Sequence, residues 1–278
     1  VLNLVLDPVV IFALHMGVAG AAVATVLSQM ASCAFVLSFL FGKKVPVKIS
    51  FGGYDRKLIQ RILLVGFTPF IIIAVDNVMI ISMNSVLQTY GGPGEGDMLI
   101  TCATIVQSFM LVITMPLGGI TGGTQTILAF NYGAGQPDRV KKAQRFIFLL
   151  SAGYTTILFI LAQTAGHIFV RLFTSDPALI AEAAKTIKIY TLAVIPLSIQ
   201  YVIVDGFTGL GKVQLSLPLS FFRKLVYFLP LFLLPRFFGA RATFYAEPIS
   251  DIIAPVVSIF VYAVAMKRIL KKPVIPNF

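Results

Sequence analysis

Residues 58–88 read LIQRILLVGFTPFIIIAVDNVMIISMNSVLQ, and this stretch decides the fold class. Within it, residues 62–83 form a run of 22 residues with a single charged side chain, Asp76. About 20 apolar residues are enough for a helix to cross the hydrocarbon core of a bilayer. The stretch is therefore predicted to be a transmembrane helix that carries one acid at membrane depth.

The acid makes this helix a candidate transport path. A charged side chain at the bilayer centre costs roughly 2.5–3.5 kcal/mol on insertion scales, so it needs a partner, a water-filled cavity or a bound cation. Asn77 follows it directly, and Asn84 and Gln88 continue a polar stripe at helical spacing. We predict Asp76 and Asn77 as cation ligands and Asn84 on the substrate path. A purely structural ion pair, or a place near the membrane edge, is the alternative for Asp76.

The composition extends this prediction to the whole chain. Its 278 residues are 58% hydrophobic and 12% charged, and the mean hydropathy is +0.92. Such values indicate an all-α, polytopic membrane protein. A net charge of +11 would suggest nucleic acid in a soluble protein, but here the bases fall between apolar runs. The positive-inside rule explains that pattern, so no nucleic-acid partner is expected.

Uncharged runs place the other spans. With residues 62–83 they predict seven complete crossings, after a partial one in residues 1–14, and an external amphipathic helix at 178–188. Basic segments near residues 43–61, 139–145 and 267–272 are assigned to the cytoplasm, with the C-terminus inside. The further predicted spans are 18–42, 98–130, 146–170, 189–210, 213–235 and 242–266.

Polar residues recur on one face of three of these spans. Asp205 is a second intramembrane acid, which we predict to join Asp76 in binding the cation, although it could instead sit at the cytoplasmic mouth. Glu247 and Asp251 lie four residues apart on one face, either on the path or facing water at the outer interface. The remaining predicted substrate-path residues are Gln107, Thr114, Thr121, Ser198, Tyr201 and Asp251.

A weak internal repeat suggests how the chain is divided. Shifted by 222 positions, Pro8 meets Pro230 and Gly17 meets Gly239. Two halves in the same orientation are a known plan for transporters. We therefore expect residues 1–42 to end an N-terminal bundle, 43–57 to be a cytoplasmic linker and 58–272 to form a six-helix C-terminal bundle. The numbered chain is then expected to be a piece of a longer protein whose first spans are missing.

Several short motifs resemble the multidrug and toxic compound extrusion (MATE) transporters over the whole chain, and the last of them is similar to the MepA-like branch. They are Asn3-Leu-Val-Leu-Asp-Pro8 with Gly17–Thr25, Gly66-Phe-Thr-Pro69, Pro116-Leu-Gly118, Asn131-Tyr-Gly-Ala-Gly135 with Arg139, Gly209-Leu-Gly-Lys212 and Pro248-Ile-Ser-Asp251. The resemblance implies two six-helix bundles around a central cavity, of which this chain would supply the second and the tail of the first.

The resemblance also implies a role for Asp76. NorM-like members carry a cation-binding acid on the seventh span, ten residues after the glycine of a Gly-Phe-Pro opening. Asp76 lies ten residues after Gly66, but aspartate replaces the usual glutamate and Thr68 is an extra residue in the opening. Acids on the tenth span serve similarly, and Asp205 is on the corresponding helix.

The expected function is export of organic, often cationic compounds across the plasma membrane, coupled to inward flow of sodium or protons. Sodium would bind at Asp76, and no other cofactor is expected. The expected partners are membrane lipid, the organic substrates and the missing N-terminal bundle. One alternative is a lipid-linked sugar flippase, for which Arg223 and Lys224 could bind pyrophosphate; another is a non-transporting scaffold. No metal-ligand cluster or nucleophile elbow points to an enzyme.

Overall fold

The structure is a computed structural model that describes residues 2–42, 52 and 55–270. The predicted linker at 43–57 lies largely outside the described residues, as do Lys271 and Lys272. The described elements are α1 (Leu2–Pro8), the π-helix η1 (Val9–Ala13), α2 (Gly17–Leu40), α3 (Arg56–Gly91), α4 (Glu95–Gly133), α5 (Pro137–Val170), α6 (Pro177–Tyr190), α7 (Val194–Gly209), α8 (Val213–Phe238), the 3-10 helix η2 (Ala240–Tyr245) and α9 (Ala246–Ile269).

These helices confirm an all-α, multi-pass membrane protein. Among the described residues, six helical segments are long and apolar enough to cross a membrane, or seven if α6 and α7 count as one broken span. Each of the seven predicted crossings falls on one of them, and the short apolar helix Leu2–Ile11 matches the partial span. Uncharged runs locate the helices well because an apolar segment that crosses lipid must satisfy its backbone hydrogen bonds internally, and a helix does so.

Contacts divide the chain into two compact units, Val1–Leu63 and Leu64–Phe278. In the first unit, α2 packs against α1 and η1. Gly20 makes this approach possible, because a Cβ at that position would lie 3.0 Å from Val10 Cγ1. The boundary falls within α3, a few residues after the predicted start of the C-terminal bundle.

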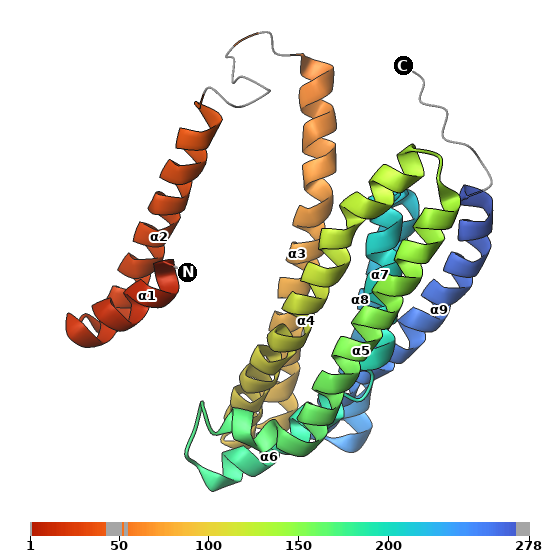
Figure 1. The fold of residues 1–278 in the computed structure, drawn as a ribbon. Helices are drawn as coiled ribbons and strands as arrows, with labels where there is room; N and C mark the ends of the chain where they lie inside the picture. The colour runs from red at the N-terminus through yellow and green to blue at the C-terminus, as the bar shows by residue number, and fades with distance from the viewer. Residues whose placement is uncertain (1, 43–51, 53–54, 271–278) are drawn as a thin grey trace. The chain divides into compact units, whose positions relative to one another are not determined.

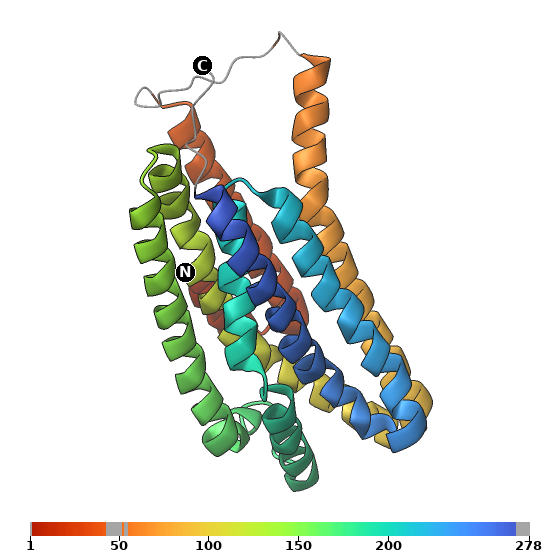
Figure 2. The same cartoon turned by 90° about the vertical axis from the view of Figure 1, so that its right-hand side faces the viewer.

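The second unit is a helical bundle with α7 at its centre. The α7 helix packs against α4, α5, α8 and α9, while α8 and α9 run side by side (Figures 1 and 2). Its 16 residues span about 24 Å at 1.5 Å per residue, less than the hydrocarbon core of about 30 Å. The α7 helix is therefore too short to cross the hydrocarbon core by itself, and the elements at its two ends must complete the crossing.

The α6 helix extends α7 toward one end of the bundle (Figure 1). The two are bent by 50° at the break. Asp176 is the N-cap of α6, and its carboxylate accepts from the Ala178 amide at 2.9 Å. At the break, the Gln163 side chain of α5 donates to the Lys188 carbonyl at 3.0 Å and to Thr191 Oγ1 at 3.3 Å. A neighbouring helix thus satisfies polar groups that the bend leaves open.

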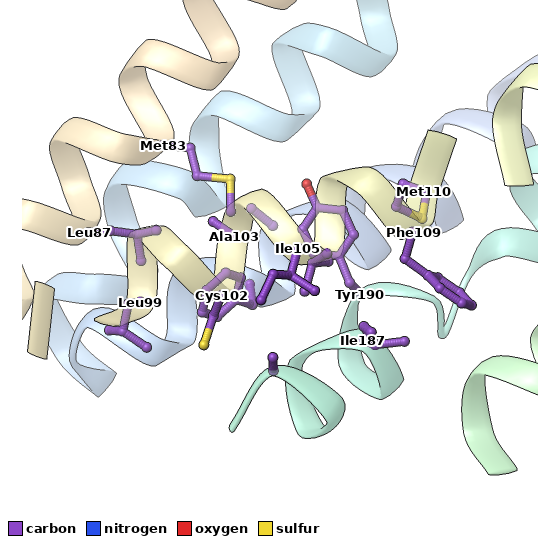
Figure 3. Close-up of a cluster of buried hydrophobic side chains, with 14 of the residues drawn as sticks. Met83, Leu87, Leu99, Cys102, Ala103, Ile105, Phe109, Met110, Ile187 and Tyr190 are labelled. Carbon is purple, nitrogen blue, oxygen red and sulfur yellow. The ribbon is translucent and has the colours of Figure 1, made fainter. Parts of the chain in front are cut away.

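Two apolar clusters fill the bundle. The first includes Met83, Leu99 and Tyr190 (Figure 3), and the second includes Leu128 and Phe207. On α4, α5, α7, α8 and α9, buried polar residues lie between the positions that belong to the two clusters. We call these residues the middle polar layer: Thr121, Ser151, Thr155, Ser198, Gln200, Lys224, Ser250, Asp251 and Ser258.

Candidate functional site

A pocket of about 260 Å³ opens within the second unit, beside the middle polar layer. Its wall is rich in flexible and aromatic side chains, which suit ligands of varied shape. One of its methionines has two polar neighbours: Met83 Sδ accepts from Tyr227 Oη at 3.5 Å and from Gln107 Nε2 at 3.8 Å. The lining residues are Asp76, Met79, Ile80, Met83, Gln107, Met110, Leu111, Thr114, Tyr190, Leu197, Tyr201, Arg223, Tyr227 and Glu247.

Asp76 lies on the pocket wall and forms an ion pair with Lys224 of α8. The Lys224 ammonium also donates to the Ile72 carbonyl at 2.7 Å, so α3 supplies both acceptors. The two side chains differ in burial: 48% of the Asp76 side chain is exposed, against 5% for Lys224. A ligand in the pocket therefore meets the carboxylate before the ammonium.

Arg223 joins α8 to α9 through two further ion pairs. Its Nη1 lies 3.1 Å from Asp251 Oδ1 and 3.3 Å from Glu247 Oε1. Glu247 also accepts from Tyr190 Oη at 3.4 Å, which connects the group to α6. Asp251 is fully buried, and a charge so placed is tolerated only with a partner. This arginine group gives the pocket a charged wall in which one guanidinium is shared by two acids.

Asp205 belongs to a different polar group, on the α4 side of α7. Its carboxylate accepts from Thr121 Oγ1 and, at 3.1 Å, from Gln125 Nε2. The helices come close here: a Cβ on Gly209 would lie 3.0 Å from Gln125 Cα. The structure thus places Asp76 and Asp205 in separate polar groups, each with its own partners.

The predicted substrate-path residues divide among these sites. Gln107, Thr114 and Tyr201 line the pocket together with Asp76. Thr121 binds Asp205, and Asp251 pairs with Arg223 behind the pocket wall.

Three further predicted residues also lie outside the pocket lining. Asn77 is exposed, and its side-chain amide donates to the Ile73 carbonyl at 2.9 Å. Ser198 is buried and donates to the Ile195 carbonyl at 2.7 Å, while Asn84 is partly buried. The cation-binding role of Asn77 and the path roles of Ser198 and Asn84 remain predictions.

Sequence reasoning missed the basic partners of the intramembrane acids. Arg223 and Lys224 stand side by side in the middle of an otherwise apolar span. Opposite charges at membrane depth tend to pair with one another. Matching each isolated acid with a base of another span would have pointed to these two residues.

Known proteins with similar sequences are drug exporters by name. The chain is 22% identical over 262 residues to the multidrug export protein MepA of Staphylococcus haemolyticus, covering 94% of this chain and 57% of that protein. It is also 22% identical over 252 residues to MepA of Staphylococcus aureus, covering 90% and 54%. The chain thus spans little more than half the length of these relatives.

A solved structure shares the fold. An outward-facing multidrug resistance MATE family transporter of the MOP superfamily superimposes with a TM-score of 0.84 at 21% identity, over 98% of this chain and 61% of that one. The MatE family model matches residues 73–233, more than half of the chain. The match includes Asp76, its partner Lys224 and Arg223. The chain therefore belongs to the MATE family of transporters.

Proposed function

We propose that the full-length protein exports lipophilic organic compounds, many of them cationic, in exchange for sodium ions or protons. The observation that carries this proposal is Asp76, a carboxylate accessible from a pocket with methionine and tyrosine walls. A negative charge in an apolar pocket attracts either an organic cation or a coupling ion. Competition of the two for one carboxylate would couple their movements in opposite directions.

The transporter would act in the plasma membrane with its C-terminus in the cytoplasm. The excess of lysine and arginine near residues 139–145 and 267–272 supports this orientation. Membrane lipid would surround the apolar faces, and the N-terminal bundle would complete the substrate cavity. The export of drugs that gives MepA its name supports the substrate class.

The pairing of the basic residues favours this function over a lipid-linked sugar flippase. A pyrophosphate group would need free arginine or lysine side chains in the pocket. Arg223 is held by Glu247 and Asp251, and Lys224 is held by Asp76. Both bases in the pocket region are therefore already matched by acids.

The decisive experiment measures ethidium efflux from a pump-deficient host that expresses the full-length protein. We expect Asp76→Asn to insert normally and to abolish efflux driven by a sodium or proton gradient, because the amide can neither exchange a proton nor balance a cation. Asp97→Asn, the same change at an exposed acid in the first turn of α4, should leave efflux unchanged. Undiminished efflux by Asp76→Asn would refute the role of this carboxylate.

A further inference from the structure

The Asp76–Lys224 pair contains an internal cation at the position where an external one would bind. Lys224 Nζ is anchored to α3 by two acceptors, Asp76 and the Ile72 carbonyl. Among the described residues that line the pocket, Asp76 is present and Lys224 is absent. The Asp76 carboxylate thus faces the pocket, while Lys224 contacts this carboxylate from outside the pocket lining.

The other charges of the pocket are less available for exchange. Arg223 has two carboxylate partners, and its planar guanidinium fits them with several donors in fixed geometry. Lys224 instead offers a compact charge on a flexible four-carbon chain. It also keeps the Ile72 carbonyl as a partner at 2.7 Å when Asp76 is taken from it. Asp76 is therefore the pocket carboxylate whose counter-ion is easiest to replace.

We propose that Lys224 is a tethered counter-ion of Asp76 that a lipophilic monovalent cation displaces when it enters the pocket. This inference rests on the proposed function and names the residue that sets its specificity. The ammonium competes for the carboxylate, so it weakens the binding of every monovalent cation. An organic cation overcomes the competition through apolar contact with the wall near Met79, Met110 and Leu197. A small inorganic ion gains no such contact.

The test measures ethidium binding to the purified full-length protein by fluorescence polarisation. We expect Lys224→Gln to bind ethidium about tenfold more tightly than the wild type, because the competing ammonium is removed from the carboxylate. Lys224→Arg keeps the competing charge and should show no gain. Lys188→Gln makes the same substitution at an exposed position on α6 and should also leave the affinity unchanged.

A double variant identifies the carboxylate that is released. Combining Asp76→Asn with Lys224→Gln should remove the gain, because the acid is then absent. An unchanged or weaker affinity for Lys224→Gln overturns the inference, and so does a gain that persists in the double variant. Circular dichroism and size-exclusion profiles that match the wild type confirm that each variant is folded.

Binding and transport outcomes separate this inference from the proposed function. If wild-type vesicles export no ethidium but Lys224→Gln still binds it more tightly, the proposed function fails and the exchange at Asp76 stands. If export depends on Asp76 while Lys224→Gln binds with wild-type affinity, the proposed function stands and the role given to Lys224 is wrong.

Discussion

Arg223 is the residue on which the charged wall of the pocket depends. It pairs with both Asp251, which has 1% of its side chain exposed, and Glu247, which has 12% exposed. Removing one partner from a buried ion pair costs about 3–5 kcal/mol, since the charge that remains is neither hydrated nor paired. Here a single substitution would leave two acids one helical turn apart without their common base.

We therefore expect Arg223→Met to lower the free energy of unfolding by about 3–5 kcal/mol. Chemical denaturation of the purified full-length protein in detergent, followed by circular dichroism, measures this loss. Arg236→Met is a matched control at an exposed position on the same helix, where a change within about 0.5 kcal/mol is expected. Equal stability of the two variants would show that the arginine group is not a structural element.

Asp76 illustrates how far single residues can be interpreted from sequence. Its position in an apolar run predicted a helix whose acid has a partner, a cavity or a bound cation. In the structure the acid lies on a pocket within the bundle. Its partner Lys224 is 148 residues away, on another helix. Which helices become neighbours depends on tertiary packing, so hydropathy and spacing on one helix could not identify the pair.

At the scale of elements, the contact between α4 and α7 positions the Asp205 carboxylate. Gly209 allows the α7 backbone to approach Gln125, and the Gln125 side chain in turn donates to Asp205. A methyl group at Gly209 would lie 3.0 Å from both Cα and the carbonyl oxygen of Gln125. Backbone atoms of a helix cannot move aside as the end of a side chain can, so the two helices would have to separate.

Gly209→Ala should therefore destabilise the full-length protein by about 1–3 kcal/mol, the usual cost of overpacking. Gly153→Ala provides the control, because a Cβ at that exposed position of α5 would meet no described atom within 4 Å. Alanine favours a helix over glycine by up to about 1 kcal/mol, so the control should be neutral or stabilised. Thermal melts by circular dichroism compare the two, and equal melting temperatures would contradict the role of the close contact.

The elements themselves were largely predictable, whereas the break between α6 and α7 was predictable only in part. Asp176 and Pro177 indicated the start of α6 in the sequence, since a capping acid before proline is a common helix start. The predicted span at 189–210 nevertheless begins too early, because α6 continues to Tyr190 and α7 starts at Val194. Gln163 of α5 supports the bend. A contact from another helix cannot be inferred from the pattern of apolar residues within the span.

At the scale of the whole molecule, the orientation in the membrane is a testable consequence of the charge pattern. The turn between α3 and α4 contains Pro93, and the turn between α4 and α5 contains Gln136; both residues are exposed. The positive-inside rule assigns the basic end of α5 to the cytoplasm, so these two turns should lie on opposite sides. Cys33 is exposed, so a Cys33→Ser background removes its contribution to labelling.

In that background of the full-length protein, we expect Pro93→Cys to react in intact cells with a membrane-impermeant maleimide. Gln136→Cys should react only after the membrane is permeabilised. Cys102 is buried and serves as an internal reference that stays unlabelled in the folded protein. The reverse pattern of labelling would show that the C-terminal bundle is inserted the other way round.

The middle polar layer has a consequence for the electrical work of transport. It lies between two apolar clusters and away from both ends of the bundle, so a charge that reaches it has crossed only part of the voltage across a membrane. Moving one elementary charge through the entire field takes about 2.3 kcal/mol per 100 mV, and an ion that stops at the layer performs only part of that work. Binding of a cation at Asp76, on the pocket beside this layer, and not only the passage between the two faces, should therefore respond to the resting potential of the cell.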